Sequence, residues 1–393
     1  MKPLPITAFT LVTALGCGQA AHTRALRDGA SGLRAQTFES ASFDAWLGVV
    51  DGVDDEPLPR ELARHDCRNN RLAALALRGD GFDDAVRRAV ARHGAARVAV
   101  LVGTSTSGIL QTEVAYRERG ADGALPAWLH YRETHDTASL AQFVRAALGL
   151  EGPAWVISTA CSSGAKAYAA AARLIALGLV DAAVVGGCDS MCLTTLYGFR
   201  ALELLSSEAC RPWDARRNGL SLGEGASFAL LQRDDDAPAA WLLGCGESSD
   251  GHHMSSPHPE GLGAVAAMRA ALADAQLQPD AVDYLNLHGT GTRSNDATED
   301  HAVCSVFGRA LRCSSTKGHT GHALGAAGAI EAAITMLALR HGVLPQGLHC
   351  EQPDPALHAN YLREPQQRTI AVAASNSFGF GGSNACLVLG APR

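Results

Sequence analysis

The side chains in this sequence most able to do covalent chemistry begin with a cysteine. Cys161 stands in the run STACSSG at 158–164. A strand is predicted to end there and an Ala-rich helix over 162–177 to begin, which places the sulfur at a helix N-terminus. Free N–H groups and the positive dipole end lower a cysteine pKa from about 8.5 to roughly 3.5–7.5. We predict a nucleophile whose amide can bind an oxyanion; a buried cysteine at a strand–helix turn fits equally well.

Two histidines are candidates to act beside this thiol. His288 follows an apolar strand predicted at 284–287 and precedes a GTGT run. The end of a strand before such a loop is where α/β folds place ligand-facing residues, although a hydrogen-bonded core histidine is the alternative. His322 ends the run KGHTGH, at the predicted start of a helix over 322–341.

Glu331 lies on that same helix, which is otherwise apolar. A carboxylate in a buried helix must be paired or protonated, and Lys317 is its nearest candidate partner. No cysteine or carboxylate pattern completes a tetrahedral metal set, so we expect no metal site. The groups considered for one are His319 with His322, His252 and His253 with His258, and Cys188 with Cys192.

A glycine-rich run with two aromatic rings, NSFGFGGSN, occupies residues 376–384. Glycines on both sides of Phe378 and Phe380 predict a loop whose backbone can swing. Large rings on such a loop suit a gate over an apolar pocket, and a tight turn with core aromatics is the alternative.

The elements that position these residues form two similar halves. Each half runs from a strand through a turn of small residues into a buried helix and then into another strand, which is α/β patterning. The helices over 162–177 and 322–341 are apolar on nearly all faces, so they belong in the interior. We predict an α/β/α/β/α sandwich with halves over 1–236 and 237–393. The run at 233–238 is a surface hairpin or the join between them.

Composition narrows the class of protein. The chain has 393 residues, 47% of them hydrophobic, a net charge of −7 and 11 cysteines. A compact globular protein is indicated and a generally basic nucleic-acid binder is disfavoured. An odd number of cysteines, mostly in apolar stretches, fits a reducing cytoplasm. The apolar start of the chain mimics a signal peptide, but we expect a first buried strand followed by a helix.

Taken together, the motifs resemble those of the β-ketoacyl-[acyl carrier protein] synthases of the I/II type. The similarity spans nearly the whole chain, in order and at family spacing. It rests on these segments: LVTALGCG at 11–18, TACSSGAKA at 159–167, RPWDARRNGLSLGEGA at 211–226, SDGHHMSSP at 249–257, HGTGT at 288–292, STKGHTGHALGAAGAIE at 315–331 and NSFGFGGSN at 376–384.

The resemblance implies the thiolase fold, a duplicated five-layer αβαβα sandwich that is usually dimeric. It also implies a decarboxylating Claisen condensation. Cys161 would be acylated by a primer thioester of acyl carrier protein. His288 and His322 would donate hydrogen bonds to the malonyl thioester oxygen as CO₂ leaves. The amides of Cys161 and Phe378 would hold the oxyanion, and no metal or organic cofactor would be needed.

Other roles follow from the same resemblance. Lys317 and Glu331 match a buried ion pair that orients the histidines. The partner would be acyl carrier protein, with a homodimer expected and a heterodimer with a related subunit possible. The residues matching the pantetheine-binding threonines, the gating loop and its opposing loop are Thr290, Thr292, Phe378, Phe380, Asp250 and His253.

Docking of an acidic carrier protein on a net negative chain requires a local basic patch. Four arginines match a basic family segment near the pocket mouth. Their spacing predicts one face of a single helix, with a solvated basic face as the alternative. They are Arg60, Arg64, Arg68 and Arg71.

The sequence also departs from the family pattern. Ser-Thr-Ala-Cys replaces the frequent Asp-Thr-Ala-Cys, His319 stands where a larger apolar residue is common, and a small polar run at 103–108 lies in the acyl-pocket region. These departures leave open whether the pathway is fatty-acid synthesis or a specialised polyene or polyketide-like one. Competing interpretations are a thiolase, a type III synthase, a cysteine protease, and a non-catalytic chain-length-factor subunit, which would typically lack the nucleophile.

Overall fold

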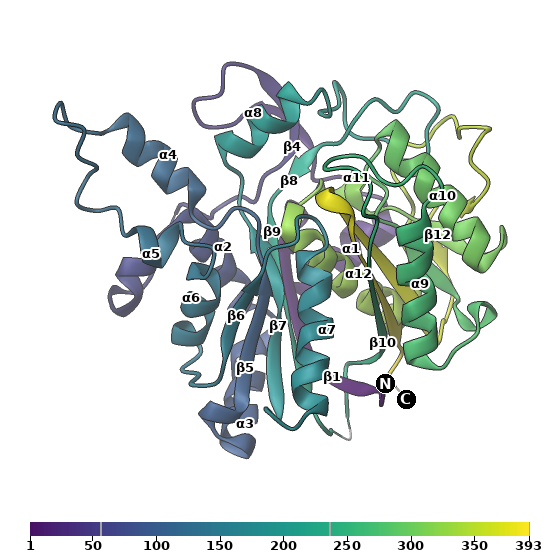
Figure 1. Ribbon diagram of the computed structural model, residues 1–393, viewed down its shortest axis with the longest axis horizontal. Coiled ribbons are helices and arrows are strands. Elements are labelled where there is room, and N and C mark those ends of the chain that lie inside the picture. The colour runs from purple at the N-terminus through teal and green to yellow at the C-terminus, as the bar shows by residue number, and fades with distance from the viewer. Residues whose placement is uncertain (56, 236, 393) are drawn as a thin grey trace.

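The computed structural model describes residues 1–55, 57–235 and 237–392. Each half of the chain builds five core strands in the same spatial order (Figure 1). In the first half the order is β6-β5-β7-β9-β1, and in the second it is β12-β11-β16-β17-β10. These strands are β1 (Leu4–Thr13), β5 (Val98–Gly103), β6 (Ala154–Ile157), β7 (Ala182–Asp189), β9 (Gly225–Gln232), β10 (Ala240–Ser249), β11 (Tyr284–Asn286), β12 (Arg312–Ser314), β16 (Val372–Gly379) and β17 (Ser383–Gly390).

Strand directions repeat as well. In each half the first two pairings in that order are parallel and the last two are antiparallel. The halves join where β1 pairs with β10 through Leu4, Pro5 and Ile6. Shorter strands extend or flank the sheet: β2 (Gly16–Cys17), β3 (Arg34–Thr37), β4 (Asp44–Gly48), β8 (Leu222–Gly223), β13 (Val343–Leu344), β14 (Asn360–Tyr361) and β15 (Gln366–Gln367).

Helices separate and cover the sheet halves, giving the five layers expected. The nearly all-apolar helices α7 (Ser163–Ala176) and α12 (Ala327–His341) pack against each other in the middle. Figure 1 shows them between an outer layer of α2, α3 and α6 and one of α9 and α10. The outer helices are α2 (Arg68–Leu77), α3 (Phe82–His93), α6 (Ser139–Ala147), α9 (Leu262–Ala275) and α10 (Arg293–Phe307).

The remaining helices lie around this sandwich. As expected, the chain starts with a buried strand, β1, followed by a helix. These remaining helices are α1 (Gly18–Asp28), α4 (Ile109–Arg117), α5 (Tyr131–Thr134), α8 (Leu193–Ala201) and α11 (Lys317–Thr320). Among the described residues, no helix combines the length and the apolar character needed to cross a bilayer.

Two predicted boundaries are wrong. The helix expected to start at His322 starts at Ala327, because Gly321 (φ 75°) and Leu324 (φ 50°) leave the right-handed helical region. The loop expected over 376–384 is mostly strand, since β16 and β17 pair in register from Gly379↔Ser383 onwards. Only the turn Phe380–Gly382 lies between them.

The run at 233–238 connects β9 to β10, and β1 lies between those two strands. It is therefore not a hairpin. Residue 236, at the predicted boundary between halves, lies outside the described residues. The division into 1–236 and 237–393 stays a prediction.

Candidate active site

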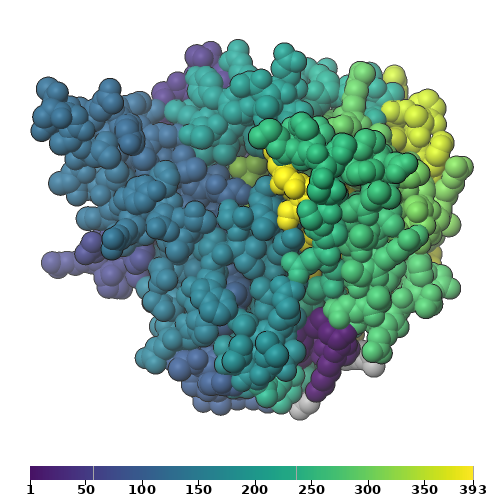
Figure 2. Space-filling view, viewed as in Figure 1, coloured from purple at the N-terminus to yellow at the C-terminus, as the bar shows by residue number. Residues whose placement is uncertain are grey.

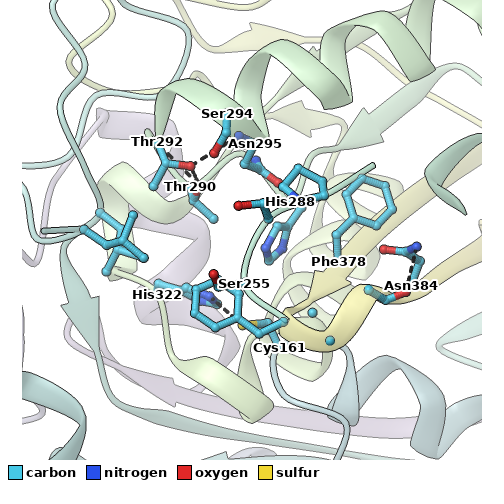
Figure 3. A pocket seen from close by; sticks show the side chains of 18 of the residues that line it. Cys161, Ser255, His288, Thr290, Thr292, Ser294, Asn295, His322, Phe378 and Asn384 are labelled. Atoms are coloured by element: carbon cyan, nitrogen blue, oxygen red, sulfur yellow. Dashed lines mark hydrogen bonds between the residues drawn. The ribbon is translucent and has the colours of Figure 1, made fainter. Parts of the chain in front are cut away.

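Cys161 is held in a strained turn between β6 and α7. The preceding residue, Ala160, has φ 52°, a region that non-glycine residues rarely occupy. Ser163 stabilises the turn, because its hydroxyl donates to the Ala160 carbonyl and accepts from the Thr159 N–H at 2.8 Å. The sulfur thus sits just before the first turn of α7, facing the pocket of Figure 3.

The structure brings both predicted histidines to this sulfur (Figure 3). His322 Nε2 lies 3.1 Å from Cys161 Sγ. The His288 and His322 rings are 5.3 Å apart, centre to centre, and nearly perpendicular. One sulfur and one ring nitrogen from each histidine all lie within 4.8 Å of one another. A small group bound at Cys161 would therefore face two imidazoles.

Burial dominates the acid–base behaviour of the thiol. Cys161 is 6% exposed, and burial raises the pKa of its thiol to about 11, although the Lys317 charge lowers it in part. The prediction of a lowered thiol pKa from the helix N-terminus is therefore wrong, because loss of water around the sulfur raises the pKa by more than the Lys317 charge and the Phe380 backbone hydrogen bond lower it. The resting group is a thiol.

His288 is positioned by a carboxylate that sequence analysis missed. Glu299 on α10 accepts the backbone N–H groups of His288 at 2.8 Å and Gly289 at 2.7 Å. It also accepts from the Asn376 side-chain amide at 3.1 Å. Burial raises the pKa of Glu299 to about 7. Glu299 stands in a polar run, SNDATED, that is typical of a solvent-exposed helix. The sequence therefore did not indicate that Glu299 would be buried.

Lys317 determines which nitrogen of His288 carries the hydrogen. Its buried ammonium contacts the Glu331 carboxylate and the His288 carbonyl oxygen, and lies 3.4 Å from His288 Nδ1. An ammonium only donates, so Nδ1 must present its lone pair. His288 is therefore the Nε2–H tautomer, which is a donor. Burial raises the pKa of Glu331 to about 7, with Lys317 opposing the rise.

Both histidines are neutral at neutral pH. Burial, reinforced by the Lys317 charge, holds the pKa of each ring well below the usual range. His322 lies in the loop between α11 and α12. His319 turns away from it and contacts two backbone carbonyls, Ala30 at 2.7 Å and Gln346 at 2.9 Å. His319 and His322 therefore form no joint ligand pair.

Phe378 and Phe380 lie in different elements and have different neighbours. A backbone hydrogen bond from Phe380 lowers the pKa of the Cys161 thiol, but burial raises that pKa by more. The expected oxyanion-binding role of the Phe378 amide stays a prediction; Phe378 lies inside β16, which continues to Gly379, whereas Phe380 lies in the turn that follows. The Phe378 ring lies 5.8 Å from the His288 ring, and the Phe380 ring lies 5.8 Å from Phe199 on α8.

A pocket opens above these residues. Figure 2 shows the yellow C-terminal residues exposed in a hollow between the two halves. Thr290 and Thr292 line the pocket with their hydroxyls 2.9 Å apart. Thr292 is also the N-cap of α10. The pocket lining includes Cys161, Phe199, Leu204, Leu220, Asp250, Ser255, Ser256, Pro257, His288, Thr290, Thr292, Ser294, Asn295, His322, Phe378 and Phe380.

Two residues, Asp250 and His253, were predicted on the loop that faces the turn Phe380–Gly382, and of these Asp250 lines the pocket. Asp250 accepts from the Asn384 side chain at 2.8 Å and donates its N–H to the Gly382 carbonyl at 2.8 Å. It thus ties the loop to the turn. His253 is exposed and accepts from its own loop at Ser255 N–H, so it does not line the pocket described here.

The small polar run at 103–108, expected in the acyl-pocket region, donates hydrogen bonds to Asp189, a second carboxylate that sequence analysis missed. Asp189, buried at the end of β7, accepts the hydroxyls of Thr104 and Thr106, both at 2.7 Å. It also accepts the N–H groups of Ser105 and Thr106. These hydroxyls therefore satisfy Asp189 within the fold.

The arginine patch is not one helix face. Arg60–His65 is a 3₁₀ helix that ends before α2 begins at Arg68. Arg68 is 5% exposed and pairs with buried Glu224 and with Asp54, so its assignment to carrier docking is wrong. Glu224 is a further buried acid that the sequence did not reveal. Of the four arginines, Arg71 is half-buried against Asp66, Arg64 is exposed with Glu133 as a partner, and Arg60 is exposed.

Comparison with known proteins shows the family of the chain. The Beta-ketoacyl synthase N-terminal domain matches residues 71–237, and the C-terminal domain matches residues 239–351. The chain is 31% identical to 3-oxoacyl-[acyl-carrier-protein] synthase 2 of Vibrio cholerae over 98% of this chain and 97% of that protein. It is 37% identical to Nodulation protein E of Rhizobium meliloti over 75% of each.

A solved structure is similar over its full length. It is the ketosynthase (ApeO) in complex with its chain length factor (ApeC) from Xenorhabdus doucetiae, with a TM-score of 0.90, 39% identity, and coverage of 99% of this chain and 98% of that one. Fold and site therefore define a thiolase-superfamily condensing enzyme of the acyltransferase class. The chain belongs to the beta-ketoacyl synthase family.

Removing the carboxylate beside Lys317 tests the buried pair. We expect Glu331→Ala to lower the free energy of unfolding by about 3–5 kcal/mol, because a buried charge loses its partner. Activity falls too, since Lys317 no longer holds the His288 tautomer. Urea unfolding at pH 8 measures the change. Glu331→Gln keeps the volume and removes the charge, so it should lose stability as well; wild-type unfolding of both variants contradicts the pairing.

Proposed function

We propose that this protein is a 3-oxoacyl-[acyl-carrier-protein] synthase that performs decarboxylative Claisen condensation and lengthens an acyl chain by two carbons. The observation that carries the proposal is the cluster of Cys161 with two neutral histidines in one pocket. The name of the Vibrio cholerae relative supports the same reaction.

The first step is transfer of an acyl group to the enzyme. The Cys161 sulfur attacks the thioester carbonyl of an acyl carrier protein, a new carbon–sulfur bond forms, and the pantetheine sulfur leaves with the proton that Cys161 gives up. The Phe380 N–H faces the sulfur, and together with the Cys161 N–H it is placed to bind the transient oxyanion.

The second step makes and uses a carbanion. Malonyl carrier protein loses CO₂, and the electrons of the broken bond form an enolate on the thioester. His288 Nε2–H donates to that oxygen, and His322 faces the same space. The enolate carbon then attacks the acyl-Cys161 carbonyl and expels the cysteine sulfur. Neutral donors stabilise charge that is present mainly in the transition state, and the scheme needs no metal or organic cofactor.

A neutral donor pair is favoured over an imidazolium. Burial and the Lys317 charge both oppose a second positive charge at the rings. Thr290 and Thr292 at the pocket wall are placed to bind the pantetheine arm. The presence of Cys161 with both histidines argues against a non-catalytic chain-length-factor role.

We propose that the working unit is a dimer, either of two copies or with a related synthase subunit. Within the part of the chain that the structure describes, β6 is an edge strand of the sheet, and its Trp155 is 53% exposed. An open edge with an exposed aromatic side chain favours pairing with another chain. The ketosynthase of Xenorhabdus doucetiae is solved with its chain length factor, which supports a heterodimer.

For the pathway we propose a class of biosynthesis, and for the cellular compartment the cytoplasm. Similar proteins include a 3-oxoacyl-[acyl-carrier-protein] synthase 2 and a ketosynthase solved with its chain length factor. We propose that the substrate belongs to fatty-acid synthesis or to polyene and polyketide-like synthesis. All 11 cysteines, each within the described residues, are free thiols. That state supports the reducing cytoplasm as its location.

Product analysis tests the reaction and the nucleophile together. Incubated with malonyl carrier protein and a panel of acyl carrier proteins, the wild type should release a 3-oxoacyl product two carbons longer than the primer, detected by mass spectrometry. Cys161→Ala should abolish condensation and the acyl-enzyme adduct, while Cys161→Gln retains malonyl decarboxylation. An intact adduct on the Ala variant would overturn the assignment.

The histidines are tested by the step they serve. We expect His288→Ala and His322→Ala each to slow condensation by ~10²–10³, the scale of losing an oxyanion donor. Acylation of Cys161 should persist in at least one variant, because the enolate forms only later. Stopped-flow condensation and intact-mass acylation measure the two steps. Wild-type condensation in both variants rules out the enolate-binding role.

Carrier docking is tested at Arg64, one of the two arginines of the predicted patch that are exposed. Arg64→Glu should raise KM for carrier-protein substrates by about twofold to fivefold, since exposed charge pairs contribute about 0.2–1 kcal/mol. Rising salt should mimic it in the wild type. Arg88→Glu on α3 is the matched control and should change nothing. An unchanged KM in Arg64→Glu moves the docking site elsewhere.

A further inference from the structure

A half-buried lysine close to the nucleophile has no role in the reaction described above. Lys166 lies on α7, and its side chain is 15% exposed. Its ammonium donates to the Ser383 hydroxyl at 2.7 Å. Burial lowers the pKa of Lys166. Removing an ammonium group partly from water costs free energy unless a hydrogen-bond partner replaces the water. The contact with Ser383 supplies such a partner.

Ser383 closes the turn that faces Cys161. It is the first residue of β17 and pairs with Gly379, the last residue of β16. Between them lies the turn Phe380–Gly382. This turn lines the same pocket as Cys161, and a backbone hydrogen bond from Phe380 lowers the pKa of the Cys161 thiol. Lys166 therefore contacts the base of the turn that carries this donor.

The other anchors of the turn come from an exposed loop. Gly382 accepts from the Asp250 N–H at 2.8 Å, and Gly381 donates to the Met254 carbonyl at 2.7 Å. Met254 itself is 78% exposed. Gly381 and Gly382 have φ values of 81° and 75°, a region that glycine adopts without strain. Lys166, by contrast, reaches the turn from α7, a helix packed in the middle layer.

We propose that Lys166 is a positioning residue: through Ser383 it holds the Phe380 N–H against the Cys161 sulfur and so sets the reactivity of the nucleophile. The inference rests on the proposed role of Cys161. Its test needs only the thiol, so failure of the condensation reaction would not be mistaken for failure of this contact.

Two other effects of Lys166 must be separated from positioning. Its charge acts over distance, and it also lies 4.0 Å from Glu247, which pairs with exposed Arg173. Ser383→Ala removes the contact and keeps the Lys166 charge. Arg173→Met disturbs Glu247 on its exposed side and leaves the turn untouched. The charged and titratable groups that otherwise act on Cys161 are Lys317, Asp189, Glu331, His288 and His322.

The experiment is the pH dependence of Cys161 alkylation by iodoacetamide, followed by mass spectrometry of the peptide. Lys166→Met and Ser383→Ala should each raise the apparent pKa by about half a unit to one unit, which slows alkylation at pH 8 by roughly threefold to tenfold. The double variant should match the singles, because both remove one contact. Lys166→Arg should restore part of the rate, and Arg173→Met should match the wild type.

Three outcomes overturn the proposal. The first is a wild-type profile for Ser383→Ala, which would show that any effect of Lys166→Met is that of its charge alone. The second is additivity in the double variant, which would show independent effects. The third is an equal change in Arg173→Met. A folding defect is recognised separately by the melting temperature and by the rescue in Lys166→Arg.

Discussion

One buried positive charge organises the candidate active site. The Lys317 ammonium contacts the Glu331 carboxylate and the His288 carbonyl, and it lies beside His288 Nδ1. Removing such a charge from water is costly unless it is paired and hydrogen-bonded. Those contacts connect α11, α12 and the loop after β11. Burial and the same charge hold the pKa of both imidazoles well below the usual range, so both rings are neutral.

The duplicated topology explains why this charge can serve a thiol from the other half of the chain. The equivalent helices α7 and α12 pack side by side in the middle layer of the sandwich (Figure 1). The Cys161 turn precedes α7, and the His322 loop precedes α12. The packing of these helices therefore brings the sulfur within 3.1 Å of the ring nitrogen.

Around this centre, buried acids hold the backbone rather than act on substrate. Glu299 accepts N–H groups of the His288 loop, Asp189 those of residues 105 and 106, and Glu224 those of Val50 and Met191. Each of these carboxylates accepts hydrogen bonds from backbone N–H groups in the interior of the fold. A buried N–H group without an acceptor would lower the stability of the folded protein. Loops that carry reactive groups thereby keep a fixed shape in a dry site.

The sequence by itself determined the fold class, the two-half organisation and the catalytic candidates. Apolar helices, a histidine after a strand, a histidine before a helix and a cysteine among small residues are all features of local spacing, which a single chain displays. Its motifs also carried the family resemblance. Pairing of Lys317 with Glu331 was predictable because a lone acid in an apolar helix requires a partner.

Only the tertiary structure decided what depends on neighbours distant along the chain. Arg68 looked exposed beside Arg64, but Glu224 buries it. Cys161 looked activated by a helix end, but its burial raises the thiol pKa. Phe378 lies inside β16 because β17 pairs with that strand as far as Gly379, so of the two phenylalanines only Phe380 falls in the turn. Burial, strand register and long-range hydrogen bonds arise when separate segments pack together, so local spacing along the chain does not encode them.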